Sequence, residues 1–373
     1  MAMPQKILLV HLYSNGDCLY ATAVARQIKH DFPGCILTWA IASFCKGIIA
    51  NNPYVDNIME IDIAKNDVPA FRNLKKKFQL QKKQGCFDEL FVIHNMDTNL
   101  AYYDGCIRSG ILKAYPFAIT VPVQPVLNLY DEEIKSVADF AEKYQLQNYK
   151  HVILFEFAPQ SRQLNITKEF AFSVSEQLCL DKDVAIVLSS PNKVDHPFEN
   201  IIDGSLLSFR ETAALTHYCT LLLGCSSGIT WISTSSAAKQ LPMVQLINPD
   251  GAWLNPVSRD FKRFGLNVNQ VIEITEMNIA LVVNCLKTAM TDFASAREKY
   301  NKAIPVNFKT TRKIVYNLLC YFEFAAIATH IKVNKQVHGN KFALYTEVLL
   351  AVITAPFKLL TNIIRKKILK IES

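Results

Sequence analysis

The sequence predicts an α/β protein with two doubly wound halves that face a cleft, followed by a basic, apolar helical tail. Three observations lead to this expectation. Short apolar runs alternate with stretches of helical apolar spacing, which is typical of a parallel sheet covered by helices. The alternation is interrupted around Pro116, Pro122 and Pro125 and then restarts. After residue 308 the pattern changes to long apolar stretches broken by lysine and arginine.

The first half contains four expected strands with helices between them. The strands are expected at residues 6–11, 35–41, 58–61 and 89–93, where short apolar runs are bounded by turn residues. Helices are expected at 19–28, 44–50, 70–83 and 132–144, and the last of these is expected to close the first half.

The second half repeats the alternation. Strands are expected at 152–155, 184–188, 221–223 and 242–247, and helices at 169–178, 210–218 and 229–238. The two halves fit two Rossmann-like domains, 1–148 and 149–308. Ligands bind beyond the carboxyl ends of strands in open parallel sheets, so the loops after the first, fifth and seventh strands are expected to form the site.

The tail, residues 309–373, carries the positive charge of the chain. It has eleven Lys/Arg and three acidic residues, whereas the whole chain has a formal net charge of +7. Such a local charge argues against a general nucleic-acid-binding surface and favours an anionic membrane surface as partner. The uncharged run at 348–357 is too short for a span, which needs about 20 residues. A helix lying in the membrane interface fits it, and a helix pair packed on the second domain is the alternative.

The cysteines and the start of the chain bear on location. The ten cysteines form no C-x-x-C pair and mostly lie inside apolar runs, which is typical of buried thiols in a reducing compartment rather than of a disulfide framework or zinc site. The first residues lack the pattern of a secretory signal. We therefore expect a cytoplasmic protein, peripheral on the inner face of the cytoplasmic membrane, with no metal site.

The first candidate loop is Ser14-Asn15-Gly16-Asp17, between the first strand and the first helix. Gly16 permits a tight turn and close approach of a ligand to the backbone. Asp17 stands where a helix N-cap belongs, so simple capping is the alternative to a chemical role. The loop has no G-x-G-x-x-G pattern, so a Rossmann dehydrogenase is poorly supported.

The second candidate loop is the small, hydroxyl-rich segment 224–230 between a buried strand and a helix. Free N–H groups at a helix N-terminus attract anions, so this loop predicts a diphosphate site. A third segment, 157–163, places a cation and several hydrogen-bond donors on the same side of the second sheet. The expected donor-binding residues are Ser161, Arg162, Gln163, Ser190, Ser226, Ser227, Gly228, Ile229 and Thr230.

Several motifs together resemble glycosyltransferase family 9, the ADP-heptose:lipopolysaccharide heptosyltransferases. In the first half these are Ile-Leu-Leu-Val at 7–10, Gly16-Asp17, Ala-Val-Ala-Arg-Gln-Ile at 23–28, Phe-Pro-Gly at 32–34, Leu-Thr-Trp at 37–39 and Asn-Pro-Tyr-Val-Asp at 52–56. In the second half they are the segments 208–215, 222–228 and 241–244, in the order that the family shows. The resemblance covers roughly residues 6 to 300.

This resemblance implies a GT-B fold and an inverting, metal-independent transferase without a cofactor. Asp17 would be the general base on the acceptor hydroxyl, and the second domain would bind the nucleotide-sugar donor. The acceptor would be a lipopolysaccharide-type or other lipid-linked glycan, contacted by Asn15 and Gly16. The transferred sugar would be heptose or another hexose-like sugar.

Three departures from the family pattern leave the donor sugar and nucleotide open. Ser226 stands where the family usually has Asp, and Trp231 where it usually has His. Gln163 takes the place of a phosphate-binding Lys, with Arg162 beside it as a substitute. The alternative function is therefore a catalytically inert relative that binds a nucleotide or serves as a scaffold in cell-envelope polysaccharide assembly.

A basic run lies on the helix expected at 70–83. Lys75 and Lys76 within it are candidate acceptor-binding residues, and a solvated helix face is the alternative. His94 follows the fourth strand and is expected to be a packed or hydrogen-bonded histidine rather than a second base.

Overall fold

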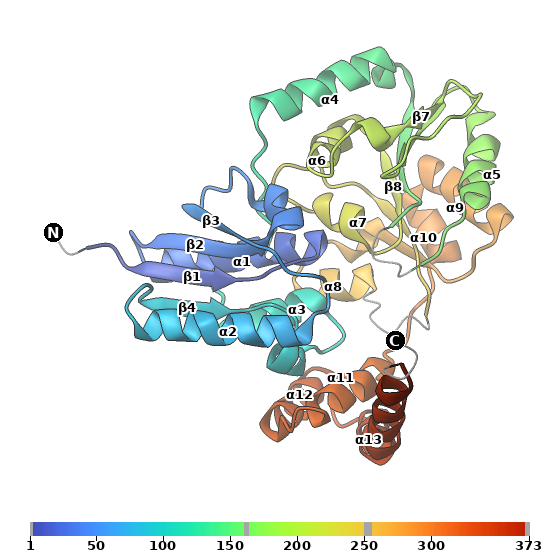
Figure 1. Ribbon diagram of the computed structural model, residues 1–373. Coiled ribbons are helices and arrows are strands. Elements are labelled where there is room, and N and C mark those ends of the chain that lie inside the picture. The colour runs from blue at the N-terminus through green and yellow to red at the C-terminus, as the bar shows by residue number, and fades with distance from the viewer. Residues whose placement is uncertain (1–2, 160–163, 250–255, 370–373) are drawn as a thin grey trace.

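The computed structural model describes residues 3–159, 164–249 and 256–369. It consists of two α/β domains side by side and a bundle of three C-terminal helices (Figure 1). Each domain is built on its own parallel sheet, as the alternation in the sequence predicts.

The first sheet has the strand order β3-β2-β1-β4, with every neighbouring pair parallel. Its strands are β1 (Lys6–Val10), β2 (Ile36–Ala42), β3 (Asn57–Ile61) and β4 (Glu89–Val92), each within one residue of the predicted bounds. The connecting elements are α1 (Asn15–Asp31), the 3-10 turn η1 (Ser43–Ile49), α2 (Val68–Lys83), the 3-10 turn η2 (Asp97–Tyr102) and α3 (Ile107–Lys113). The apolar run of β1 is buried on both faces, as in a central parallel strand.

The second sheet has the strand order β10-β9-β8-β5-β6-β7, again all parallel. Its strands are β5 (His151–Glu156), β6 (Val184–Ser189), β7 (Ile201–Asp203), β8 (Leu221–Gly224), β9 (Met243–Leu246) and β10 (Val271–Ile274). Its helices are α5 (Lys168–Cys179), α6 (Glu211–Leu215), α7 (Gly228–Ile232), α8 (Val257–Arg263), α9 (Ile279–Thr291) and α10 (Phe293–Tyr300). The edge strands β7 and β10 were not predicted, because three or four residues carry little pattern.

Helix α7 is much shorter than the predicted helix at 229–238, which was wrong in length. It ends at Ile232, where hydroxyl side chains bind the backbone of its own last turn. Ser233 Oγ donates to the carbonyl of Thr230, and Thr234 Oγ1 donates to that of Trp231, each at 2.7 Å. Such local bonds compete with helix continuation.

Helix α4 (Asp131–Lys143) does not close the first domain, contrary to the prediction. It packs on α6 of the second domain (Figure 1). A two-bond ion pair fixes the contact: Arg210 Nε and Nη2 lie 2.7 and 2.8 Å from the two carboxylate oxygens of Glu133. The chain therefore crosses between the domains before α4 begins.

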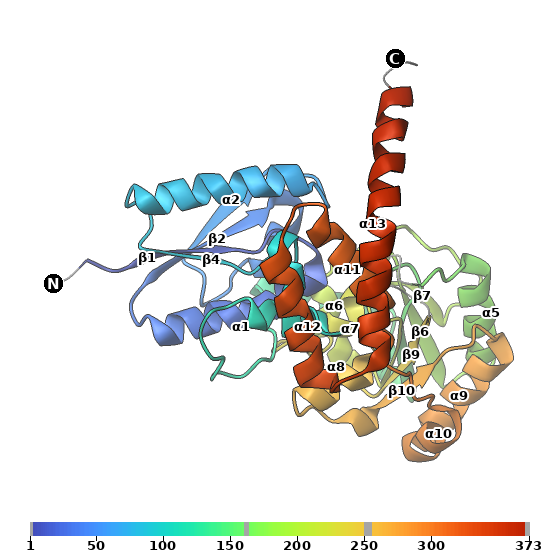
Figure 2. The ribbon, with the colours of Figure 1, turned by 90° about the horizontal axis from the view of Figure 1, so that it is seen from below.

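The tail forms α11 (Lys309–Leu319), α12 (Phe324–His338) and α13 (Phe342–Leu369). Helix α12 packs on η2 of the first domain, where Asn334 Nδ2 donates to the carbonyl of Tyr103 at 3.0 Å. A helix pair packed on the second domain is therefore not what the structure shows. Helix α13 packs on α11 and extends beyond its neighbours (Figure 2). Within the described residues, no helix meets the length and hydropathy needed to cross a bilayer.

Candidate active site between the two domains

The loop after β1 turns sharply into α1. Ser14 takes a left-handed conformation with φ of 45° and is the residue before the helix, so it holds the N-cap position that was expected of Asp17. Asp17 instead lies in the first turn of α1, where a carboxylate is favoured by the helix dipole. The capping interpretation of Asp17 is therefore wrong.

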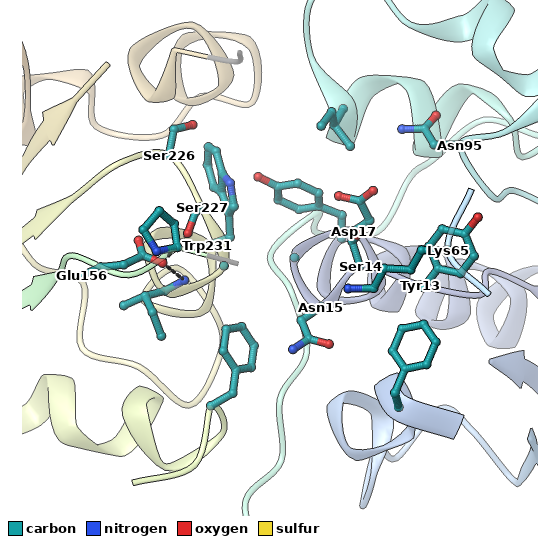
Figure 3. Close-up of a pocket in the computed structure, with 18 of the residues that line it drawn as sticks. Tyr13, Ser14, Asn15, Asp17, Lys65, Asn95, Glu156, Ser226, Ser227 and Trp231 are labelled. Atoms are coloured by element: carbon teal, nitrogen blue, oxygen red, sulfur yellow. Dashed lines mark hydrogen bonds between the residues drawn. The ribbon is translucent and has the colours of Figure 1, made fainter. Parts of the chain in front are cut away.

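A cavity of about 1170 Å³ lies between the domains, at the carboxyl ends of both sheets. Of the residues expected to form the site, Asn15, Gly16, Asp17, Ser190, Ser226, Ser227, Gly228 and Ile229 line it. Figure 3 shows Ser14, Asn15 and Asp17 on one wall and Ser226, Ser227, Glu156 and Trp231 on the other. The cavity is large enough for a ligand of nucleotide-sugar size.

Asp17 is the carboxylate of the first-domain wall. It is partly shielded from solvent, and burial raises the pKa of its carboxyl to about 7. Burial acts in this direction because a low-dielectric environment disfavours the charged form. A carboxylate with a pKa near neutral pH is a stronger base than an exposed one and is still partly ionised.

The loop after β8 presents far fewer free donors than the sequence predicted. Ser227 Oγ and the backbone N–H of Ile229 donate to Oε1 of Glu156, the second at 3.2 Å. The N–H of Ser226 and the hydroxyl of Thr230 donate to Gln245 Oε1, at 2.7 and 3.1 Å. The helix that follows has only five residues. Two backbone N–H groups of this loop therefore already have acceptors within the protein and are not available to a ligand.

Glu156 is the carboxylate of the second-domain wall, at the end of β5. Only 3% of its surface is exposed, and it lines the cavity. Burial raises its pKa, and the hydrogen bonds from Ser227 and Ile229 oppose that rise because they favour the ionised form. Thr230, by contrast, is fully buried behind the wall.

Where the two domains meet at the cavity, buried side chains join them. The Tyr20 ring of α1 meets the Trp231 ring of α7 edge-on, with centroids 5.2 Å apart. The guanidinium of Arg108 lies 4.5 Å from the Tyr20 ring and 3.1 Å from Asp260 of α8. Arg108 and Asp260 are both buried, so the pair joins the domains away from solvent.

The two lysine candidates do not line the cavity. Lys75 pairs with Asp97 at 3.7 Å, Lys76 is exposed, and neither lines the cavity. Ser161, Arg162 and Gln163 lie outside the described residues. His94 lines the cavity but is buried, and its ring packs on those of Tyr13 and His11. Burial holds the His94 pKa well below its usual value, and the expectation of a packed histidine is confirmed.

The sequence analysis missed five residues at or beside this site. Glu156 falls between the predicted strand 152–155 and the candidate segment 157–163, and Arg108 and Asp260 belong to helices that were not predicted. Lys313 and Asn317 of α11 also line the cavity, although the tail was expected only to anchor or pack. Among the residues that the structure describes, no group of three or more His, Cys, Asp or Glu is placed to hold a metal ion.

Solved structures with similar folds include glycosyltransferases and an epimerase. A glycosyl transferase family 9 protein from Veillonella parvula is 14% identical, with a TM-score of 0.52 over 79% of this chain and 94% of its own. The E. coli ADP-heptose lps heptosyltransferase II is 13% identical, with a TM-score of 0.52 over 77% and 98%. A putative UDP-N-acetylglucosamine 2-epimerase from Listeria monocytogenes is 9% identical, with a TM-score of 0.51 over 86% and 98%.

These likenesses show that the chain has the GT-B fold that the sequence resemblance implied. No family model and no curated protein sequence matches the chain. Transferases and an epimerase share this fold, so the fold alone does not identify the reaction. The reaction depends on the residues of the site.

Proposed function

We propose that this protein is an inverting glycosyltransferase that moves heptose or another hexose-like sugar from a nucleotide-sugar donor to a lipopolysaccharide-type or other glycolipid acceptor. The observation that carries the proposal is Asp17, which lines the interdomain cavity with a pKa of about 7. A sugar hydroxyl is a weak nucleophile and loses its proton as the new bond forms, so it needs a base at this position.

The two domains take different roles in this proposal. The first, which ends before α4, presents Asn15, Gly16 and Asp17 to the acceptor, and the second faces the donor. The acceptor hydroxyl attacks the anomeric carbon from the side of Asp17, and the bond to the nucleoside diphosphate breaks on the opposite side. Inversion follows from this single displacement. Asp17 takes the proton of the hydroxyl as the bond forms.

A second candidate function is a catalytically inert relative that binds a nucleotide or serves as a scaffold. The hydrogen bonding of the second loop favours it, because Ser226, Ser227, Ile229 and Thr230 already donate to Glu156 or Gln245. A transferase must stabilise the negative charge that develops on its leaving group. The two candidates differ in turnover but not in fold.

A panel of nucleotide sugars tests the proposal. The melting temperature is measured with ADP-, UDP-, GDP- and CMP-linked sugars, since a ligand that binds only the folded state stabilises it. The sugar nucleotide that stabilises the protein is then offered with lipid-linked glycan acceptors. We expect a stabilising donor and Asp17-dependent transfer. Stabilisation without transfer to any acceptor would favour the inert relative, and no stabilisation would count against both.

We also propose that the tail holds the protein on the inner face of the cytoplasmic membrane. One side of α13 packs on α11 through the buried Leu344, Ala351 and Ala355. The other side exposes large apolar side chains: Phe342, Tyr345, Leu349, Val352, Ile353 and Phe357. The sequence after them contains Arg365, Lys366 and Lys367. An exposed apolar face followed by cations suits an anionic membrane interface.

Flotation with anionic liposomes tests this membrane proposal. The double change Leu349→Glu with Ile353→Glu leaves the α11 contact intact, whereas removing α13 would uncover α11. Leu180→Glu, at a leucine 71% exposed on the second domain, is the matched control. We expect the native chain and the control to float and the double variant to stay behind. Equal flotation of the double variant, or none by the native chain, would contradict a membrane role for this face.

A further inference from the structure

The carboxylate of Glu156 lies where the sequence led us to expect a phosphate. It projects from the end of β5 toward the loop after β8, and it borders the cavity (Figure 3). The register of β5 and β8 brings the two together, because Phe155 lies opposite Leu223, one residue before the loop begins. Glu156 is thus held in place by the sheet itself.

Hydrogen-bond donors of the loop converge on this carboxylate. Oε1 accepts from Ser227 Oγ and from the N–H of Ile229. Oε2 lies 3.8 Å from the Cys225 thiol, a weak donor, and so retains acceptor capacity. Gln245 Oε1 accepts hydrogen bonds from the N–H of Ser226 and the hydroxyl of Thr230. The loop therefore already contains an internal anion.

A diphosphate at this loop would meet two obstacles. It would need the donors that Glu156 and Gln245 now occupy, and it would lie against a buried carboxylate. Like charges brought together in a poorly solvated site repel strongly. A hydroxyl group meets neither obstacle, since it can donate to Oε2.

We propose that Glu156 is a specificity-determining residue that excludes diphosphate from the loop 226–230. It accepts instead a hydroxyl-bearing, uncharged part of the ligand. Identifying that ligand as a nucleotide sugar rests on the proposed function, whereas the exclusion of diphosphate does not. The diphosphate of a donor is then held by other groups of the cleft. A released nucleoside diphosphate gains little affinity from this loop.

Calorimetric titration with inorganic pyrophosphate, ADP and UDP tests the exclusion. Glu156→Gln removes the charge but keeps an oxygen that can accept from Ser227 and Ile229. Glu273→Gln is the matched control, because Glu273 is also buried and accepts from the N–H and hydroxyl of Ser258, but it does not line the cavity. We expect pyrophosphate to bind Glu156→Gln at least about tenfold more tightly than the native chain, and Glu273→Gln unchanged.

Glu156→Ala provides a second form without the charge, and circular dichroism in the near ultraviolet shows which forms are folded. Equal or weaker pyrophosphate binding by a folded charge-free form would overturn the proposal and leave Glu156 as a structural cap. The same holds if both forms fail to fold, because the carboxylate is then required by the fold. Tighter pyrophosphate binding with no response to ADP or UDP would support the exclusion while counting against a nucleotide-sugar donor.

Discussion

The two loops that face each other across the cavity have similar local structure and opposite chemistry. Each follows a buried parallel strand, contains a serine with positive φ (Ser14 at 45°, Ser226 at 54°), and has a glycine in the first turn of the helix that follows. In the first loop the carboxylate of Asp17 belongs to the loop and faces the cavity. In the second, the carboxylate of Glu156 comes from a neighbouring strand and accepts hydrogen bonds from the Ser227 hydroxyl and the Ile229 N–H.

This difference shows that a strand–loop–helix pattern alone does not define an anion site. The first loop continues into a helix of 17 residues, and the second into one of five. Whether donors remain available to a ligand depends on what the adjacent strand brings to the loop. In this protein the first loop has a carboxylate that faces the cavity, and in the second loop two N–H groups and two hydroxyls donate to side chains of the protein.

The strongest effect is expected from a change in the first loop. Asp17→Asn should lower the rate of transfer by about 10²–10⁴-fold, because an amide cannot take the proton of the acceptor hydroxyl. Asn preserves the size of the side chain within the first turn of α1, so folding should be retained. Initial rates under saturating donor are the measurement, with Asp139→Asn on the exposed face of α4 as control. Near-normal turnover by folded Asp17→Asn would exclude Asp17 as the base.

The sequence predicted much of the fold around the two loops. The central strands and the Asp17 loop were found because apolar runs and turn residues are local signals. Glu156 was missed because its role depends on the pairing of β5 with β8, which is not encoded in any short segment. The placement of α4 on α6 and of α12 on η2 was missed for the same reason, since both contacts join segments far apart in the sequence. The length of α7 was overestimated because the side-chain bonds of Ser233 and Thr234 were not anticipated.

A smaller effect, on the free energy of unfolding, is expected from changes at the glycines of the two loops. A Cβ on Gly228 would lie 2.9 Å from Phe209 Cε2, whereas a Cβ on Gly16 would lie 3.4 Å from Trp231 Cδ1. We expect Gly228→Ala to lower the free energy of unfolding by about 1–3 kcal/mol and Gly16→Ala by less than about 1 kcal/mol, since only the added methyl group at position 228 is overpacked. Urea unfolding of both variants measures this. A larger loss from Gly16→Ala would mean that the first loop, not the second, is the tighter one.

The dependence of transfer on pH shows whether a base with the pKa of Asp17 controls the reaction. The base acts when unprotonated, and burial raises its pKa to about 7. The rate constant kcat/KM should therefore be level above that pH and fall about tenfold per pH unit below it. Donor affinity measured over the same range separates binding from chemistry. A rate that stays level down to about pH 5, the behaviour of an ordinary carboxylate, would contradict the assignment.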